Sequence, residues 1–246
     1  MRTANPALNE KAFQDASLGY IGDMTMTVNG AINKTFALFF LLLAGAFFTW
    51  SQFFNGNTGL VMILFWVGLI GGLIFALITI FAKTAAPFTA PAYAAFEGLL
   101  LGGLSAILES VYQGIVLQAV GLTFGVLFVM LTIYRTGIIK VTNKFRTGVI
   151  IATGSVMLVY MATWILGFFG VAIPYIHGSG LIGIGFSLVV IFIACLNLIL
   201  DFDFFEMGER ARAPKYMEWY AAFGLIVTLV WLYIEILRLL SKLRSR

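Results

Sequence analysis

Charge is scarce in this chain. Only 11% of its 246 residues are charged, whereas 61% are hydrophobic, and the mean hydropathy is +1.00. A water-soluble domain of this size carries roughly 25% charged residues, so the composition excludes that class of protein. We therefore expect an integral membrane protein.

Cysteine and histidine are almost absent, with a single residue of each, Cys195 and His177. One cysteine cannot form an intrachain disulfide or a cysteine-based metal cage, and Cys195 lies in an apolar run, where a small buried hydrophobic residue is expected. The sequence also lacks the HExxH, CxxC, Walker and GxGxxG motifs of common metal, redox and nucleotide sites. We expect neither an enzyme nor a bound cofactor.

Long apolar runs fill most of the sequence. Seven of them have the length of a helix that crosses about 30 Å of hydrocarbon, and their connections are short. The pattern predicts an all-α polytopic membrane protein with a seven-helix membrane domain at residues 35–241, between an N-terminal cytoplasmic or interfacial segment (1–34) and a basic tail (242–246). Segment 1–34 has no signal-peptide core and is expected to be retained. The predicted spans are approximately 35–52, 60–82, 87–109, 115–135, 148–171, 181–203 and 217–240.

Lysine and arginine are distributed unevenly between the spans. They occur before the first span and in the connections after the second, fourth and sixth spans, but not in the other connections. Because cytoplasmic loops are enriched in basic residues, we expect the N-terminus in the cytoplasm. The net charge of +4 then reflects membrane orientation and does not indicate a nucleic-acid surface.

The C-terminal tail breaks this alternation. Seven full spans would put its basic residues outside, whereas a re-entrant sixth or seventh segment would put them inside. Early spans dominate orientation, and long basic side chains near a helix end can reach either interface, so we favour seven full spans. The basic residues concerned are Arg238, Lys242, Arg244 and Arg246.

Glycine pairs with GxxxG spacing occur in the second, third and fourth spans. Chance alone produces such pairs in a chain with 26 glycines. The spacing therefore predicts close helix packing and no more than that. The pairs are Gly68 with Gly72, Gly98 with Gly102, and Gly121 with Gly125.

Acidic residues gather where the sixth apolar run ends, in the sequence ILDFDFFE at residues 199–206. A charge inside an apolar run has to face water, a cation or another ionisable group. Asp201 lies at the edge of the run and Asp203 follows closely, so we expect a pH-sensitive ion gate here. The alternative is a solvated loop in which these acids pair with the basic residues of segment 210–215.

Three further acids lie inside predicted spans or at their ends. Glu97 is near the middle of the third span, where a charge costs roughly 2.5–3.5 kcal/mol on insertion scales. It therefore either lines a cation or proton path or is protonated and hydrogen-bonded to a neighbouring helix. Glu109 and Glu235 lie toward the outer ends of the third and seventh spans and would form an acidic outer mouth, unless Glu235 pairs with Arg238.

Several longer motifs resemble those of a known family. They are the run APAYAAFEGLLLGG at residues 90–103, the run QAVGLTFGVLFVM at residues 118–130, the acidic end of the sixth span, and the LRLL sequence that closes the seventh. Together with the seven-span pattern, they resemble the Bax inhibitor-1 family, also called the transmembrane Bax inhibitor motif family, and within it the bacterial branch of YccA-like proteins. The resemblance covers nearly everything after about residue 23 and implies a multi-pass protein of the bacterial inner membrane.

The resemblance implies a bundle whose last helix is surrounded by the others, and a pH-sensitive calcium leak. In characterised members an aspartate at the end of helix 6 pairs with an aspartate within helix 7. Asp201 matches the first position, whereas Thr228, or its neighbour Val227, stands at the second. A threonine hydroxyl can hydrogen-bond a carboxylate but cannot share a titrating proton with it in the same way, so Asp203 or Glu218 would have to supply the second acid.

Two functions follow from these observations. The first is a cation path gated at Asp201, with calcium or protons as the permeant ion; carboxylates suit calcium, but too few of them align to predict a tight metal site. The second is a non-conducting regulatory protein that binds a membrane protease or another membrane complex, so that removal of residues 1–25 would abolish its effect. Transport of an organic solute is not favoured, because no pair of interrupted, repeat-related helices is visible.

Overall fold

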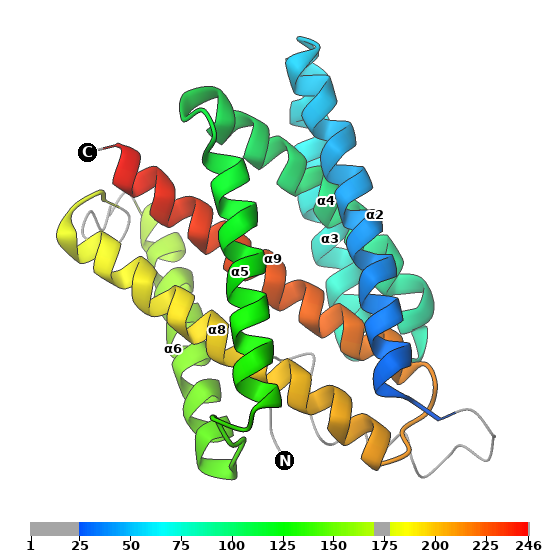
Figure 1. Cartoon of the computed structure of the whole chain (residues 1–246). Coiled ribbons are helices and arrows are strands. Elements are labelled where there is room, and N and C mark those ends of the chain that lie inside the picture. The colour runs from blue at the N-terminus through cyan, green and yellow to red at the C-terminus, as the bar shows by residue number, and fades with distance from the viewer. Residues whose placement is uncertain (1–24, 170–177, 246) are drawn as a thin grey trace. The chain divides into compact units, whose positions relative to one another are not determined.

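The computed structural model describes residues 25–169 and 178–245, and within them the chain is helical (Figure 1). Seven described helices are long and apolar enough to cross a membrane, which confirms the predicted seven-helix membrane bundle. A short 3-10 helix, η1 (Lys83–Ala85), precedes the third of them. The seven are α2 (Val28–Phe54), α3 (Thr58–Phe81), α4 (Ala86–Val111), α5 (Ile115–Arg135), α6 (Asn143–Phe168), α8 (Leu181–Arg210) and α9 (Met217–Arg244).

The helix ends lie close to the predicted limits, with two informative differences. Helix α2 begins inside segment 1–34, because Thr27 has extended backbone and its hydroxyl accepts a hydrogen bond from the amide of Gly30, which caps the helix. Helix α8 continues to Arg210, so the acidic sequence at residues 199–206 is helical throughout. Residues 1–24, His177 and Arg246 lie outside the described part of the chain, so the predictions that concern them stay predictions.

The helices form two compact units, which share α8 and α9. The first, called the α5–α6 unit here, contains Gly114–Phe202 and Thr228–Arg246. The second, called the α2–α4 unit, contains α2, α3 and α4 together with Asp203–Val227. Helix α9 contributes to both units and is the most buried of the seven helices, which agrees with the expectation of a surrounded last helix.

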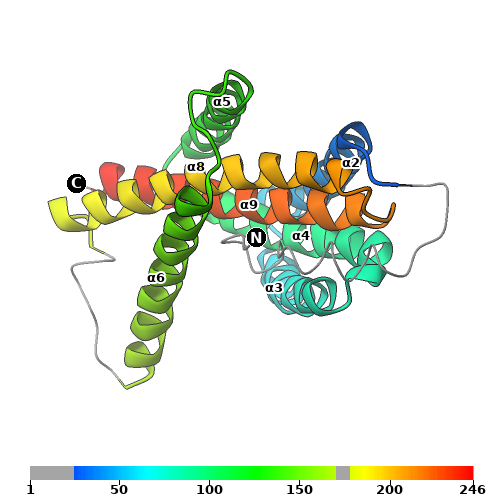
Figure 2. The same cartoon turned by 90° about the horizontal axis from the view of Figure 1, so that it is seen from below.

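Glycine allows the helices of the α2–α4 unit to approach closely. Helix α4 packs against both α2 and α3 (Figures 1 and 2). A Cβ atom on Gly98 would collide with the backbone of Leu42, and one on Gly102 with the backbone of Ala46. On α3, a Cβ atom on Gly68 would lie 2.6 Å from the amide nitrogen of Leu100. The predicted close packing is thus confirmed for Gly68, Gly98 and Gly102.

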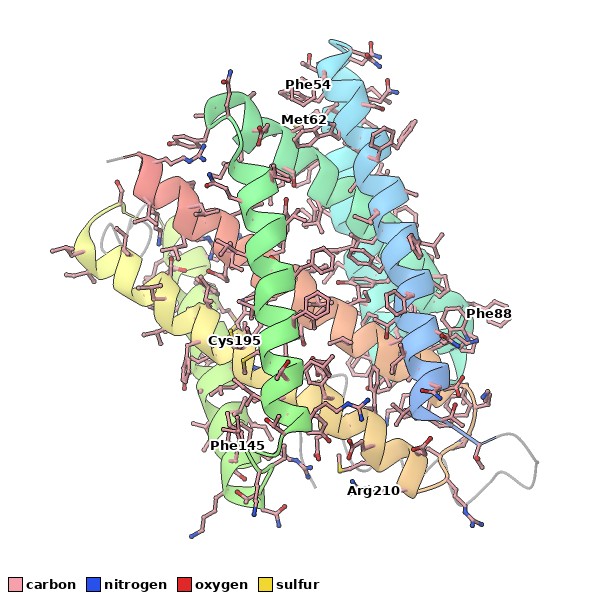
Figure 3. The ribbon with its side chains drawn as sticks, in the orientation of Figure 1. Phe54, Met62, Phe88, Phe145, Cys195 and Arg210 are labelled. Atoms are coloured by element: carbon pink, nitrogen blue, oxygen red, sulfur yellow. The ribbon has the colours of Figure 1, made fainter. Side chains whose placement is uncertain are left out.

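The third pair, Gly121 and Gly125 on α5, behaves differently, because a Cβ atom on either residue meets open space. Elsewhere, many large apolar side chains face outward, as expected for helices in contact with lipid. Phe88 is 83% exposed and points away from α4, and Phe54 at the end of α2 is 56% exposed (Figure 3).

We predict that Gly98→Ala lowers the stability of the folded protein by about 1–3 kcal/mol, because the added methyl group forces α4 away from α2. The measurement is thermal unfolding in detergent or in lipid nanodiscs. Gly125→Ala is the matched control, and it should leave stability unchanged or slightly raised, since alanine is a better helix former and the site is open. Equal effects of the two substitutions would contradict the close packing of α4.

Candidate functional site: buried acids in the helices

Asp201 lies in α8 and is completely buried, with 0% of its surface exposed. Asn197, one turn earlier on the same helix face, is also buried and donates a hydrogen bond of 2.8 Å to the hydroxyl of Thr153 on α6. Thr228 of α9 is 3% exposed and belongs to the same α5–α6 unit as Asp201. The polar face of α8 that carries Asp201 is therefore a buried face.

Asp203, in contrast to Asp201, is only half-buried. Residues two apart on an α-helix lie on different faces, so the carboxylates of Asp201 and Asp203 do not stand side by side on α8. The extension of α8 to Arg210 makes this geometry apply to the whole acidic sequence. One turn further on, Glu206 forms an exposed ion pair of 2.7 Å with Arg210, as the alternative of mutually neutralised charges predicts.

Glu218, at the start of α9, is completely buried and binds the start of α2. Its Oε1 atom accepts hydrogen bonds of 3.1 Å from both the amide and the hydroxyl of Thr27, and it forms an ion pair of 2.7 Å with Lys215. Glu209 accepts a further bond of 3.0 Å from the amide of Val28. These carboxylates face the N-terminus of α2, where the unpaired amides and the helix dipole favour negative charge.

Backbone contacts also hold the residues before α2 against the connection between α8 and α9. The amide of Met26 donates a hydrogen bond of 2.7 Å to the carbonyl of Ala213, and Thr25 pairs with Pro214 in an isolated bridge. Gly30 leaves room for the Glu218 carboxylate, since a Cβ atom there would collide with it. Within the α2–α4 unit, Glu218 therefore joins α2 to the start of α9, and the backbone contacts join it to the connection between α8 and α9.

Glu235 is the buried acid in the last part of α9, at 1% exposure. Its Oε1 atom accepts a bond of 2.7 Å from Arg238 and one of 2.8 Å from the hydroxyl of Tyr160 on α6. Arg238 also donates to the Tyr160 hydroxyl and lies over its ring. The predicted alternative, a pair between Glu235 and Arg238, is confirmed.

Lys242, one turn after Arg238, is 5% exposed. Its ammonium group donates bonds of 3.0 Å to the carbonyl of Gly183 and to the hydroxyl of Ser187, both on α8. The basic end of α9 is thus bonded to its own unit.

Glu109 is half-buried near the end of α4 and belongs to the α2–α4 unit, whereas Glu235 belongs to the α5–α6 unit, so the acidic outer mouth stays a prediction.

Glu97 lies in the middle of α4 and is 9% exposed. Its Oε2 atom faces Gly72 of α3, where a Cβ atom would approach it to 2.9 Å. Tyr93, one turn earlier, is buried and packs edge-on against Phe223 of α9, with ring centroids 4.9 Å apart. No hydrogen bond or ion pair joins Glu97 to any residue that the structure describes, so the expected bond to a neighbouring helix is not found there.

Comparison with protein families adds one decisive observation: a family model described as Bax inhibitor 1 like matches residues 5–245. The chain belongs to the Bax inhibitor 1 like family. Comparison with curated proteins and with solved structures gave no match. The motifs at residues 90–103 and 118–130 therefore did indicate the family correctly.

Several contacts in this Bax inhibitor 1 like protein were not predicted from its sequence. Thr27 stands before an apolar run, which is a recognisable helix N-cap signal, but its bond to Glu218 joins distant parts of the chain. The roles of Tyr160, Lys242 and Gly72 also depend on residues of other helices and leave no local signal. Among the described residues, no group of three or more His, Cys, Asp or Glu side chains could hold a metal ion.

We predict that Arg238→Gln lowers stability by about 1.5–3 kcal/mol, because it leaves the buried Glu235 carboxylate without its charged partner. The double substitution Glu235→Gln with Arg238→Gln should restore most of the loss. Arg210→Gln is the control, since its ion pair with Glu206 has a similar length but lies on the surface, and it should change stability by less than about 1 kcal/mol. Thermal unfolding would contradict this assignment if Arg210→Gln and Arg238→Gln had the same effect.

Proposed function

We propose that this Bax inhibitor 1 like protein is a slow, pH-sensitive cation leak in which Asp201 is the gate and Glu97 lies on the ion path. The complete burial of Asp201 carries the proposal. A carboxylate that is removed from water is costly, and protonation removes the charge, so proton binding at Asp201 is coupled to the packing around α8. No enzymatic activity is proposed.

The gate proposed here uses one aspartate. Asp203 points to another side of α8, and the Oε1 atom of Glu218 already binds Thr27 and Lys215, so neither acid is well suited to share a proton with Asp201. Thr228 has a neutral hydroxyl, which can hydrogen-bond Asp201 in either protonation state. Gating then depends on loss of the Asp201 charge itself and not on a proton shared between two acids.

The permeant ion is proposed to be calcium or a proton. Carboxylate oxygens are hard ligands that suit calcium, but calcium prefers six to eight oxygen atoms, which isolated acids do not supply. Weak, transient binding is therefore expected, as a leak requires.

We also propose that the protein belongs to the bacterial, YccA-like branch and lies in the bacterial inner membrane with its N-terminus in the cytoplasm. The contacts of the tail support seven full spans. Arg238 is paired with Glu235, Lys242 is buried against α8, and Arg244 donates to Gln118 on α5. These basic residues serve contacts within the protein, so they weigh less as orientation signals than free loop residues do.

We predict that the purified protein, reconstituted in liposomes, releases calcium or protons at a rate that changes with pH. Asp201→Asn should abolish this pH dependence, because an amide cannot take up the controlling proton. Asp203→Asn is the control on the other face of the same helix and should keep it. The gate is refuted if Asp201→Asn retains the pH dependence, and the leak is refuted if the parent protein shows no flux.

The same assay distinguishes the regulatory alternative, in which the protein binds a membrane protease or another membrane complex. Deletion of residues 1–24 keeps Thr25, Met26 and Thr27, which contact the connection between α8 and α9. Under the leak hypothesis this deletion leaves the flux intact. Loss of a cellular effect without loss of flux would favour the regulatory function.

A further inference from the structure

A buried polar stripe runs along one face of α4, in a helix that is otherwise mostly apolar. Thr89, Tyr93 and Glu97 follow one another at four-residue intervals and are 7%, 5% and 9% exposed. At 1.5 Å of rise per residue, the stripe extends for about 12 Å, from the first turns of α4 to its middle. The hydroxyl of Thr89, the first residue of the stripe, has hydrogen-bond partners. It donates to the carbonyl of Ala85 and accepts a 2.8 Å bond from Thr79 of α3.

Glu97, the last residue of the stripe, differs from Thr89 in having no such partner among the residues that the structure describes. The residue as a whole is 9% exposed, and its carboxyl group has no hydrogen bond or salt bridge to any described residue. Among the described titratable groups, Tyr93 interacts with it electrostatically. From α3 it is faced by Gly72, and from α9 the residue packed on this stripe is Phe223, neither of which carries charge. No residue in the described part of the chain donates a hydrogen bond or forms an ion pair that would balance a negative charge on Glu97.

The ligand that fits such a site is a proton. A lone carboxylate in an apolar interior becomes neutral by protonation, whereas calcium would need several more oxygen atoms than this carboxyl group and the Tyr93 hydroxyl provide. The described residues also contain no cluster of acids and histidines able to hold a metal ion.

Gly72 has a specific place in this arrangement. A Cβ atom there would lie 2.9 Å from Oε2 of Glu97, and its next nearest contact would be 3.8 Å away. A methyl group at residue 72 would therefore meet only the end of the Glu97 side chain. At Gly68, one turn earlier on α3, the same methyl group would meet the backbone of α4 at 2.6 Å. The two members of this GxxxG pair thus differ, since Gly68 permits helix packing and Gly72 leaves room for a carboxyl group.

We propose that Glu97 is a proton-binding site in the middle of the membrane and that Gly72 is the residue that positions its carboxyl group. The inference rests on the proposed ion path and deepens it by naming the proton as the ion that Glu97 binds. Protons would reach Glu97 along the face of α4 that carries Thr89 and Tyr93.

The test is labelling with dicyclohexylcarbodiimide, an apolar reagent that reacts with protonated carboxyl groups in apolar surroundings. The acid adds across a C=N bond of the reagent, its proton moves to nitrogen, and the adduct rearranges to a stable N-acylurea without a leaving group. Mass spectrometry of the digested protein locates the modified residue. In the folded parent protein we expect Glu97 to be labelled, at a rate that falls about tenfold per pH unit once the pH exceeds the pKa of the group.

Three variants complete the test. Glu97→Gln should lose the label from peptides that span residue 97. Gly72→Ala should change the labelling rate of Glu97 at least about threefold, because the methyl group displaces the carboxyl end, while Gly125→Ala, whose Cβ atom meets open space, should match the parent protein. Absence of label on Glu97 at every pH overturns the proton site, and an unchanged rate in a folded Gly72→Ala protein overturns the role of Gly72.

The labelling assay does not depend on flux, so the two proposals fail separately. A parent protein without any ion flux refutes the leak while labelling of Glu97 still reports a proton site. Conversely, flux that depends on Asp201 without labelling of Glu97 refutes the proton site alone.

Discussion

The cost of placing a carboxylate in the apolar interior governs the polar contacts of this protein. Four acids in its spanning helices are nine-tenths buried or more: Glu97, Asp201, Glu218 and Glu235. Each would destabilise its helix if it were left charged and without a partner. For Glu218 and Glu235, the contacts around the carboxylate show how this cost is met.

Two of the four carboxylates, those of Glu218 and Glu235, have partners that hold helices together. Glu218 accepts hydrogen bonds from the amide and the hydroxyl of Thr27 at the start of α2 and pairs with Lys215, so its charge is favoured by this helix terminus. Glu235 is neutralised by Arg238 and accepts a bond from Tyr160, which joins α9 to α6. These two carboxylates are therefore committed to contacts that hold helices together.

The sequence predicted most of the fold, because each span is a long apolar run whose length matches the membrane. It also predicted the pair of Glu235 with Arg238, because side chains three residues apart lie together on any helix. It did not predict that α8 extends past residue 203, so it missed that the rest of the acidic sequence, up to Glu206, is also helical. Contacts between helices, such as Lys242 with Ser187 or Glu97 with Gly72, depend on how helices pack and leave no periodic signal. The GxxxG spacing marked Gly72 for packing alone, although its absent side chain makes room for an acid.

Thermal unfolding of amide variants tests most directly whether Glu218 and Glu235 stabilise the fold while Glu97 does not. Glu218→Gln and Glu235→Gln should each lower Tm by at least about 2–4 °C, because each removes a charge that is paired in the folded protein. Glu97→Gln should leave Tm unchanged or raise it, because it replaces an acid that no described residue compensates. A fall in Tm for Glu97→Gln as large as that for Glu218→Gln would show that Glu97 is a structural residue and would contradict the account.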